Sequence, residues 1–257
     1  MITASHLIHY YSVHPVLRDV SIEVNEGELV VLMGANGCGK STLLGVMAGF
    51  LCPLEGQIKI DGVQRRSSVD AELAIRKKIA YLPDHPWLPS LKTGREFLMA
   101  VGQVYDLPTL QVMEHMQRLL ALFHLTDKGD SLIKSYSNGQ KKKIAIAATL
   151  ITEAPILLLD EPFTGGLDPS AILALKTLLK KLGERKDVTV VMASQLPEIA
   201  AHIADRIAVI RDGQILHYDT VKQLIAHQSS DNLESALEQI LNPETEDLMQ
   251  AYFHRKN

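Results

Sequence analysis

Residues 34–41 read GANGCGKS, and they decide the fold class. The stretch fits the pattern G-x-x-x-x-G-K-[ST], in which glycines allow backbone N–H groups to surround phosphate oxygens. An apolar run of strand length, LVVLM, ends directly before it at Met33, and a helix-forming stretch follows over residues 40–50. A loop between a buried strand and a helix N-terminus is the context that binds phosphate. The sequence therefore predicts a phosphate-binding loop, and the alternative is a glycine-rich turn before an ordinary helix.

A second motif supplies acidic side chains. Residues 156–162 read ILLLDEP, which is a buried strand that ends in two acids. Both carboxylates would lie at the carboxyl edge of the sheet, where α/β proteins form their ligand sites. Asp160 and the loop residue Ser41 suit a Mg²⁺ shell, whereas Glu161 suits a base that orients and deprotonates an attacking water. With Lys40 on the β- and γ-phosphates, the two motifs predict a phosphate-loop NTPase.

A third motif narrows the prediction. Residues 135–140 read SYSNGQ and precede a predicted helix over 141–149. Taken alone, they would be a polar turn that caps this helix. Because they lie between the phosphate loop and the acidic motif along the chain, they resemble the signature motif of ABC (ATP-binding-cassette) ATPases, with Asn138 where a glycine is commoner. The resemblance covers about residues 2–220.

The resemblance implies an ATP-binding and ATP-hydrolysing subunit that powers a transporter. In that family two cassettes pack head to tail, so each ATP lies between one phosphate loop and the other subunit's signature. The expected partners are therefore a second cassette, identical or different, and a separate transmembrane permease, with exporter-type permeases the favoured kind. The expected location is cytoplasmic, at the inner face of the cell membrane through the permease.

The resemblance also implies the site residues. It places Tyr11 against the adenine ring, with Tyr10 as the alternative. Residues expected to contact ATP are Tyr11, Gly34, Asn36, Gly37, Cys38, Gly39, Lys40, Ser41, Thr42, Ser137, Gly139 and Gln140. Residues expected to take part in catalysis are Lys40, Asp84, Glu161 and Gln195. Residues expected to hold Mg²⁺ are Ser41, Asp84 and Asp160.

Three positions depart from the family pattern. Asp84 stands where a glutamine is usual, and Gln195 stands where a histidine that contacts the γ-phosphate is usual. The segment 162–168 is one residue longer than the common pattern. We expect slowed hydrolysis, because the amide of Gln195 can donate a hydrogen bond but cannot become cationic. The alternatives are a regulatory subunit with little hydrolysis and a soluble ABC ATPase outside transport.

The expected fold is α/β, with a phosphate-loop NTPase core of mostly parallel sheet and an N-terminal antiparallel β-subdomain. A helical subdomain would be inserted at about 84–135, where Thr93 and Glu96 form a capping-box pattern and apolar side chains recur at spacings of three and four. The ATP-binding domain would span 1–220, and 221–257 would form a C-terminal helical extension.

Weaker signals concern charge and surface. Lys141, Lys142 and Lys143 are expected on a solvated helix face, with direct contact to phosphate as the alternative. Cys38 lies in the loop before a helix, so its pKa is expected to be lowered. Trp87, Leu88 and Leu91 are candidates for contact with the permease, and a small core cluster is the alternative.

The composition excludes several other classes of protein. The net charge of −4 gives no overall attraction to nucleic acid, which is therefore not expected as a partner. Two cysteines cannot build a disulfide framework. No apolar run approaches the roughly 20 residues that span a bilayer, and the N-terminus has no signal-peptide pattern.

Overall fold

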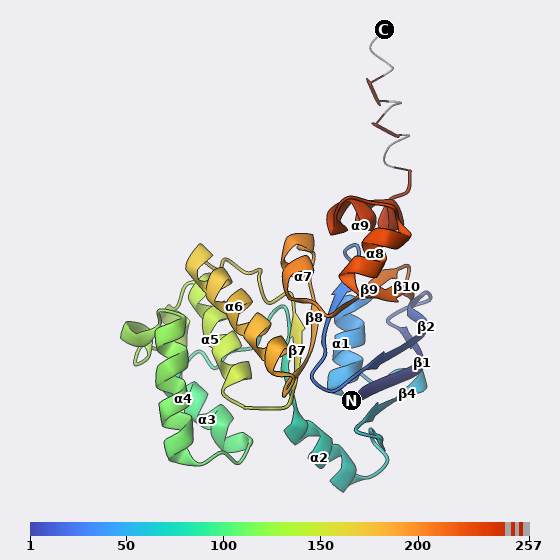
Figure 1. Ribbon diagram of the computed structural model, residues 1–257. Coiled ribbons are helices and arrows are strands. Elements are labelled where there is room, and N and C mark those ends of the chain that lie inside the picture. The colour runs from blue at the N-terminus through green and yellow to red at the C-terminus, as the bar shows by residue number, and fades with distance from the viewer. Residues whose placement is uncertain (245–247, 250–251, 254–257) are drawn as a thin grey trace.

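The computed structural model describes residues 1–244, 248–249 and 252–253 of the chain. Its strands form two sheets, and Figure 1 shows that they occupy the same half of the molecule as α1. A four-stranded antiparallel sheet has the order β2-β1-β4-β5, and a six-stranded sheet has the order β10-β9-β3-β8-β7-β6. In the larger sheet only β10 runs antiparallel to its neighbour. The predicted mixed architecture is therefore confirmed.

The strands have the following bounds. The small sheet contains β1 (Ile2–Tyr10), β2 (Pro15–Val24), β4 (Glu55–Ile60) and β5 (Val63–Gln64). The large sheet contains β3 (Leu29–Met33), β6 (Ile79–Leu82), β7 (Ile156–Asp160), β8 (Thr189–Ala193), β9 (Arg206–Arg211) and β10 (Gln214–Asp219).

The large sheet is covered on both faces, which explains why its central strands are apolar at every position. In β3, Leu29, Val31 and Met33 pack with the helices of one layer. Val30 and Leu32 point the other way and pack with α1 and the antiparallel sheet. Alternate residues of a strand face opposite sides, so a strand between two layers must be apolar throughout.

The helices have the following bounds. Helices of the first half are α1 (Lys40–Ala48), α2 (Val69–Lys78), α3 (Gly94–Val104) and α4 (Thr109–Leu122). Helices of the second half are α5 (Asn138–Leu150), α6 (Pro169–Arg185), α7 (Pro197–Ile203), α8 (Val221–His227) and α9 (Leu233–Leu241). Two 3₁₀ turns, η1 (Thr126–Lys128) and η2 (Ile133–Ser135), lie between α4 and α5.

The segment predicted as a helical subdomain contains α3 and α4, which pack on α5 (Figure 1). The predicted capping box is present, since Thr93 and Glu96 each accept a hydrogen bond from the other's backbone N–H. The predicted apolar stripe Val112, Met116, Leu119 and Phe123 is buried. Pro108 is the N-cap of α4 rather than a residue of its first turn.

The C-terminal extension forms α8 and α9, and the described chain leaves α9 at Asn242. Most of the predicted extension beyond Glu244 lies outside the described residues. Helix α9 packs on α7 and α8, and the guanidinium of Arg211 donates to the carbonyl oxygen of Ile240 at 2.6 Å. None of the described helices combines the length and the apolar character that a membrane span requires.

Candidate functional site

The phosphate loop runs from the end of β3 into α1, as the sequence predicts. Gly39 is the N-cap of α1 in a left-handed conformation, and no side chain caps the helix. The first N–H groups of α1 are therefore left for a ligand, and the helix dipole favours an anion there. The ammonium of Lys40 donates to the carbonyl oxygens of Gly34 at 2.8 Å and Ala35 at 3.0 Å. It thus lies folded over the loop that would cradle the phosphates.

Glycine is required at two positions of this loop. A Cβ at Gly34 would lie 2.1 Å from the carbonyl oxygen of Ile210, and one at Gly39 would lie 2.9 Å from that of Val16. Both residues also have φ values, 154° and 111°, that other residues rarely adopt. The loop is therefore pressed against β9 and β2, which fixes the direction of its N–H groups.

The loop and the acidic strand meet at the carboxyl edge of the sheet. The hydroxyl of Ser41 donates to Oδ1 of Asp160 at 3.1 Å, although 119 positions separate the two residues. Burial raises the pKa of Asp160, and the hydrogen bond from Ser41 opposes that shift. A hydroxyl and a carboxylate in contact are oxygen ligands of the type that Mg²⁺ prefers. Two of the three residues predicted to hold this ion, Ser41 and Asp160, are thus brought together.

Glu161 follows directly on this strand and is held in an unusual backbone conformation. Its φ is 45°, and its N–H donates to the carbonyl oxygen of Ala193. Strained backbone of this kind persists where the surrounding structure enforces it, often at active sites. Burial raises the pKa of the Glu161 carboxyl group. A base with a raised pKa accepts a proton more readily than an exposed glutamate.

Gln195 connects Glu161 to the phosphate loop. Its side-chain amide donates to Oε1 of Glu161 at 3.2 Å and to Oδ1 of Asn36 at 2.8 Å. A neutral amide therefore lies next to the carboxylate of Glu161 and within reach of the loop. Gln195, which stands where the family usually has a histidine, thus lies inside the site.

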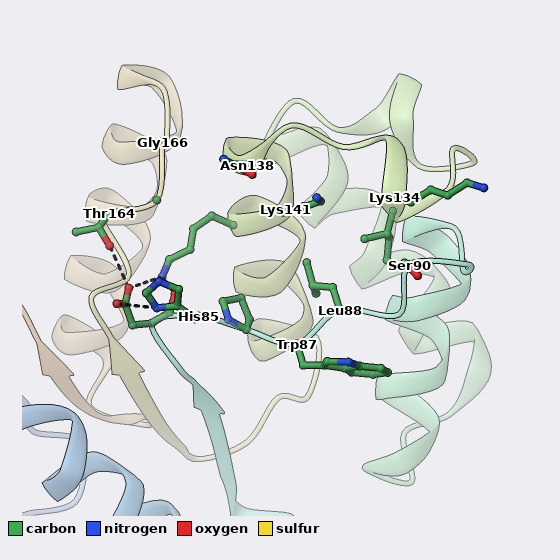
Figure 2. A pocket seen from close by; sticks show the side chains of 14 residues that line it. His85, Trp87, Leu88, Ser90, Lys134, Asn138, Lys141, Thr164 and Gly166 are labelled. Atoms are coloured by element: carbon green, nitrogen blue, oxygen red, sulfur yellow. Dashed lines mark hydrogen bonds and ion pairs between the residues drawn. The ribbon is translucent and has the colours of Figure 1, made fainter.

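Asp84 lies beside this cluster, in an open pocket of 880 Å³ (Figure 2). Its carboxylate contacts Nδ1 of His85 at 3.0 Å and accepts from the hydroxyl of Thr164 at 3.5 Å. Its charge adds to the burial that raises the pKa values of Asp160 and Glu161, so Asp84 lies near both acids. A role for Asp84 in holding Mg²⁺ stays a prediction. The sequence does not predict Thr164 as a site residue, because a single threonine after the acidic motif has no characteristic spacing.

The prediction of a solvated lysine face is wrong for two of the three lysines. Lys142 is only 4% exposed, and its ammonium donates to the carbonyl oxygen of Asp84 at 3.1 Å and lies 3.9 Å from that residue's carboxylate. Burial lowers the pKa of Lys142, while the charges of Asp84, Asp160 and Glu161 raise it. A lysine is almost never buried unless it is paired, so this side chain is held by the acids around it.

Lys143 is also buried, and it forms an ion pair with Asp168. Asp168 in turn accepts a hydrogen bond from the N–H of Ala171 and caps α6. The ion pair and these hydrogen bonds lower the pKa of Asp168. The segment 162–168, which has the extra residue, is therefore joined to α5 through its last residue, Asp168.

The signature residues cap α5 within this chain. The hydroxyl of Ser137 accepts from the N–H of Gln140 at 3.2 Å, and Oε1 of Gln140 accepts from the N–H of Ser137 at 3.0 Å. Gly139 packs so closely on Gly166 that a Cβ would lie 2.3 Å from its carbonyl oxygen. The capping turn weighed as an alternative is thus present.

Tyr11 lies next to the phosphate loop, where its hydroxyl accepts a hydrogen bond from Thr42 at 3.4 Å. Its ring is 63% exposed and meets that of His9 edge to face. An exposed ring beside a phosphate loop offers a stacking face to a planar base. The alternative Tyr10 is less exposed, at 40%.

The prediction of a lowered pKa for Cys38 is wrong. The side chain is buried, and burial raises the pKa of the thiol more than the nearby charge of Lys40 lowers it. The helix N-terminus lowers a thiol pKa where solvent can also reach the sulfur. Here the sulfur belongs to the core cluster under the loop.

We therefore expect iodoacetamide to modify exposed Cys52 well before Cys38 in the folded protein. The thiolate is the reactive species, and burial keeps the Cys38 thiol protonated. Mass spectrometry of the two peptides over time gives both rates, and denaturant should make them similar. ATP should slow only the labelling of Cys38. Equal rates for the two thiols in the folded protein would contradict the buried position.

Comparison with known proteins agrees with this geometry. The ABC transporter family model matches residues 17–164. The sulfate/thiosulfate import ATP-binding protein CysA of Synechocystis sp. is 35% identical over 215 residues, which cover 83% of this chain and 59% of CysA. The methionine import ATP-binding protein MetN of Sodalis glossinidius is 28% identical over 261 residues, which cover 100% of this chain and 76% of MetN. Each relative is therefore longer than the matched region.

A solved structure gives the same result for the fold. A dimeric ATP-binding cassette in a post-hydrolysis state, bound to ADP and Pi, superposes with a TM-score of 0.78 at 27% identity. The superposition covers 86% of this chain and 98% of that one. The family match includes the phosphate loop, the signature and the acidic strand, whose side chains meet as described above. The chain therefore belongs to the ABC transporter family, as an ATP-binding and ATP-hydrolysing subunit.

Proposed function

We propose that this chain hydrolyses MgATP at the edge formed by β3, β7 and β8. The contact between Ser41 and Asp160 carries the proposal, because it joins the phosphate loop to the acidic strand. Lys40 and the N–H groups at the start of α1 would hold the β- and γ-phosphates. Ser41 and Asp160 would hold Mg²⁺, which neutralises negative charge on the phosphates.

The residues around that edge divide the chemistry. The carboxylate of Glu161 accepts a proton from the water whose oxygen attacks the γ-phosphorus, while the bond to the β–γ bridging oxygen breaks. Gln195 holds Glu161 through one N–H, and the N–H that donates to Asn36 would turn to the transferring phosphoryl group when ATP is bound. Losing a well-aimed donor at such a site costs about 100- to 1,000-fold in rate, so an amide in place of a histidine gives slower but real turnover.

A second cassette would complete the site. Ser137, Gly139 and Gln140 lie on α5 and cap it, whereas the nucleotide loop lies at the start of α1. In this proposal the backbone at Gly139 and the hydroxyl of Ser137 contact the γ-phosphate bound by the other subunit. The dimeric cassette with ADP and Pi supports such an arrangement. Tyr11 would stack on the adenine of its own subunit.

The subunit would transmit dimer closure to a transmembrane permease at the inner face of the cell membrane. The open pocket in Figure 2 has apolar side chains at its mouth, and Trp87 is 83% exposed there. Leu88 lines the same pocket and Leu91 is exposed nearby. An exposed tryptophan beside leucines is typical of an interaction site. The permease would therefore contact the segment between β6 and α3.

Steady-state ATP turnover of the purified chain tests the proposed chemistry. We expect hydrolysis that requires Mg²⁺ and is lost in Lys40→Ala, because the alanine removes the positive charge at the phosphates. Lys180→Ala, on the exposed side of α6, should leave turnover unchanged. Tight ATP binding without turnover would instead favour a regulatory subunit. Co-purification from membranes would identify the permease.

A further inference from the structure

Three side chains of the C-terminal part converge away from the nucleotide site. They are His217 and Asp219 of β10 and His227 at the end of α8. One donor atom from each lies within 4.8 Å of the other two. His217 and Asp219 are two positions apart on a strand, so both point to the same face of the sheet. The final turn of α8 brings His227 over that face.

These groups approach one another without hydrogen bonding. Nδ1 of His217 and Nδ1 of His227 each lie 3.8 Å from the same carboxylate oxygen of Asp219. That separation is longer than the roughly 2.7–3.2 Å of an N–H···O hydrogen bond. A tetrahedral ion with bonds of about 2.0–2.2 Å holds its ligand atoms about 3.3–3.6 Å apart. Small rotations of the exposed imidazole of His227 would close the difference.

We propose that His217, Asp219 and His227 bind a Zn²⁺-class transition-metal ion. Two imidazole nitrogens and one carboxylate are the donors that such ions prefer, whereas Mg²⁺ and Ca²⁺ prefer oxygen alone. The site therefore differs in ligand type from the pair Ser41 and Asp160. Three protein ligands leave a fourth position for water.

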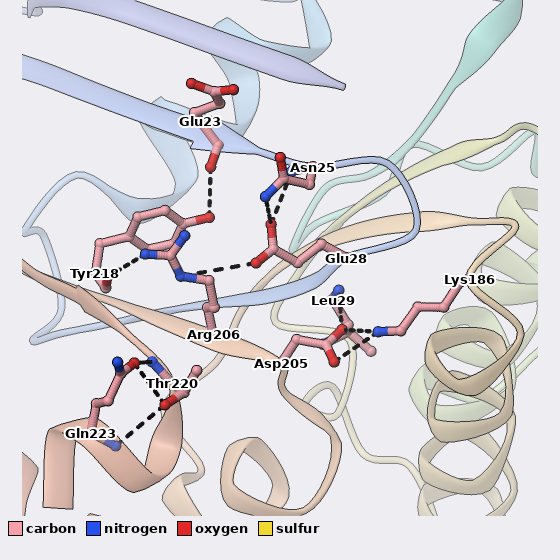
Figure 3. A network of polar contacts seen from close by, with 10 residues as sticks. All are labelled: Glu23, Asn25, Glu28, Leu29, Lys186, Asp205, Arg206, Tyr218, Thr220 and Gln223. Carbon is pink, nitrogen blue, oxygen red and sulfur yellow. Dashed lines mark hydrogen bonds and ion pairs between the residues drawn. The ribbon is translucent and has the colours of Figure 1, made fainter. Parts of the chain in front are cut away.

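The residues on either side of Asp219, Tyr218 and Thr220, are held by polar contacts (Figure 3), which favours a preformed site. Arg206 donates to the carbonyl oxygen of Tyr218 at 2.7 Å and lies over its ring at 3.7 Å. The hydroxyl of Tyr218 donates to the carbonyl oxygen of Glu23 at 2.7 Å. On the other side, Thr220 and Gln223 form the capping box that starts α8. A rigid scaffold on both sides of a ligand lowers the entropy lost on metal binding.

The bound ion would fasten α8 to the large sheet. Helix α8 packs on α9, and α9 lines a cavity whose other wall includes Gly34 and Gln195. The metal would thus fix the extension at the side of the nucleotide loop. This role rests on the position of α8 and α9 and does not depend on the proposed ATP chemistry.

The test uses the full chain without a polyhistidine tag, in the absence of nucleotide. We expect one Zn²⁺ per chain in competition with a chromophoric chelator, unaffected by millimolar Mg²⁺, and the visible spectrum of four-coordinate Co²⁺. Saturating Zn²⁺ should raise Tm by about 5 °C at 100 times its Kd. His217→Ala and Asp219→Asn should each weaken binding by more than about 100-fold, since even outer-shell partners account for about 10- to 100-fold.

His202→Ala is the matched control, because His202 is an exposed histidine at the end of the neighbouring helix α7. It should retain wild-type affinity. ATP binding by each variant reports that the chain is folded. Equal Zn²⁺ affinity in His217→Ala, His227→Ala and wild type would overturn the proposal, as would an octahedral Co²⁺ spectrum that none of the variants changes.

Discussion

Glu161→Gln is expected to lower ATP turnover by about 100- to 10,000-fold, which is the range for removal of a positioned general base. Glutamine has nearly the same shape as glutamate and can still contact Gln195, so ATP binding should be retained. Steady-state turnover and nucleotide affinity, measured on the same preparation, separate the two effects. A variant with wild-type turnover would exclude Glu161 as the base.

The pH dependence gives a second test of the same role. A base must be deprotonated to act, so kcat/KM should rise as pH increases through the pKa of Glu161. Because burial raises that pKa, the acid limb should lie at higher pH than for an exposed glutamate. Glu161→Gln should lack this limb in its residual activity. Glu184→Gln, on the exposed face of α6, should retain both the limb and the rate.

The local parts of this site could be predicted from the sequence because neighbouring residues build them. The loop over 34–41 is a turn between a strand and a helix, and its glycines, Lys40 and Ser41 are consecutive. Likewise, Asp160 and Glu161 follow an apolar strand whose length and composition identify it. Strand β3, before the loop, and strand β7, before the two acids, are both parallel neighbours of β8. The sheet therefore brings their carboxyl ends to one edge.

The environment of Lys142 could not be predicted in this way. Its burial depends on Asp84, which is 58 positions away in sequence, and a run of three lysines usually forms a solvated face. Cys38 is a similar case. Its position before a helix predicts a lowered pKa, but burial in the core beneath the loop raises the pKa instead.

The two unpredicted helices show the limit of periodicity. Half of the residues of helix α2 are charged, and its signals are Ser68, whose hydroxyl accepts from the N–H of Ala71, and the acids of its first turn. Helix α7 has only seven residues, and its signal is Pro197 at the first position. Caps and proline identify helices that are too short for their apolar residues to show a clear helical period.

Lys142→Met is expected to reduce ATP turnover by about 10- to 100-fold, through loss of a counter-charge. Asp84, Asp160 and Glu161 all interact with the ammonium of Lys142. Methionine retains the length of the side chain but removes one positive charge from beside the three carboxylates and the phosphates of ATP. A unit charge about 8 Å away contributes roughly 2 kcal/mol at an effective dielectric constant of 20. Turnover and ATP affinity should both fall, unlike in Glu161→Gln.

The double variant Asp84→Asn/Lys142→Met distinguishes charge balance from simple loss of packing. It removes one charge of each sign, so the net charge of the site returns to that of the wild type. If Lys142 acts as the counter-ion of Asp84, the double variant should recover most of the turnover lost in Lys142→Met. The two changes are then non-additive, as expected for residues in contact. Lys141→Met controls for position on α5, since Lys141 forms no ion pair within the described part of the chain. A double variant as slow as Lys142→Met would contradict the counter-ion role. It would show that Lys142 contributes through packing or folding and not by balancing the charge of Asp84.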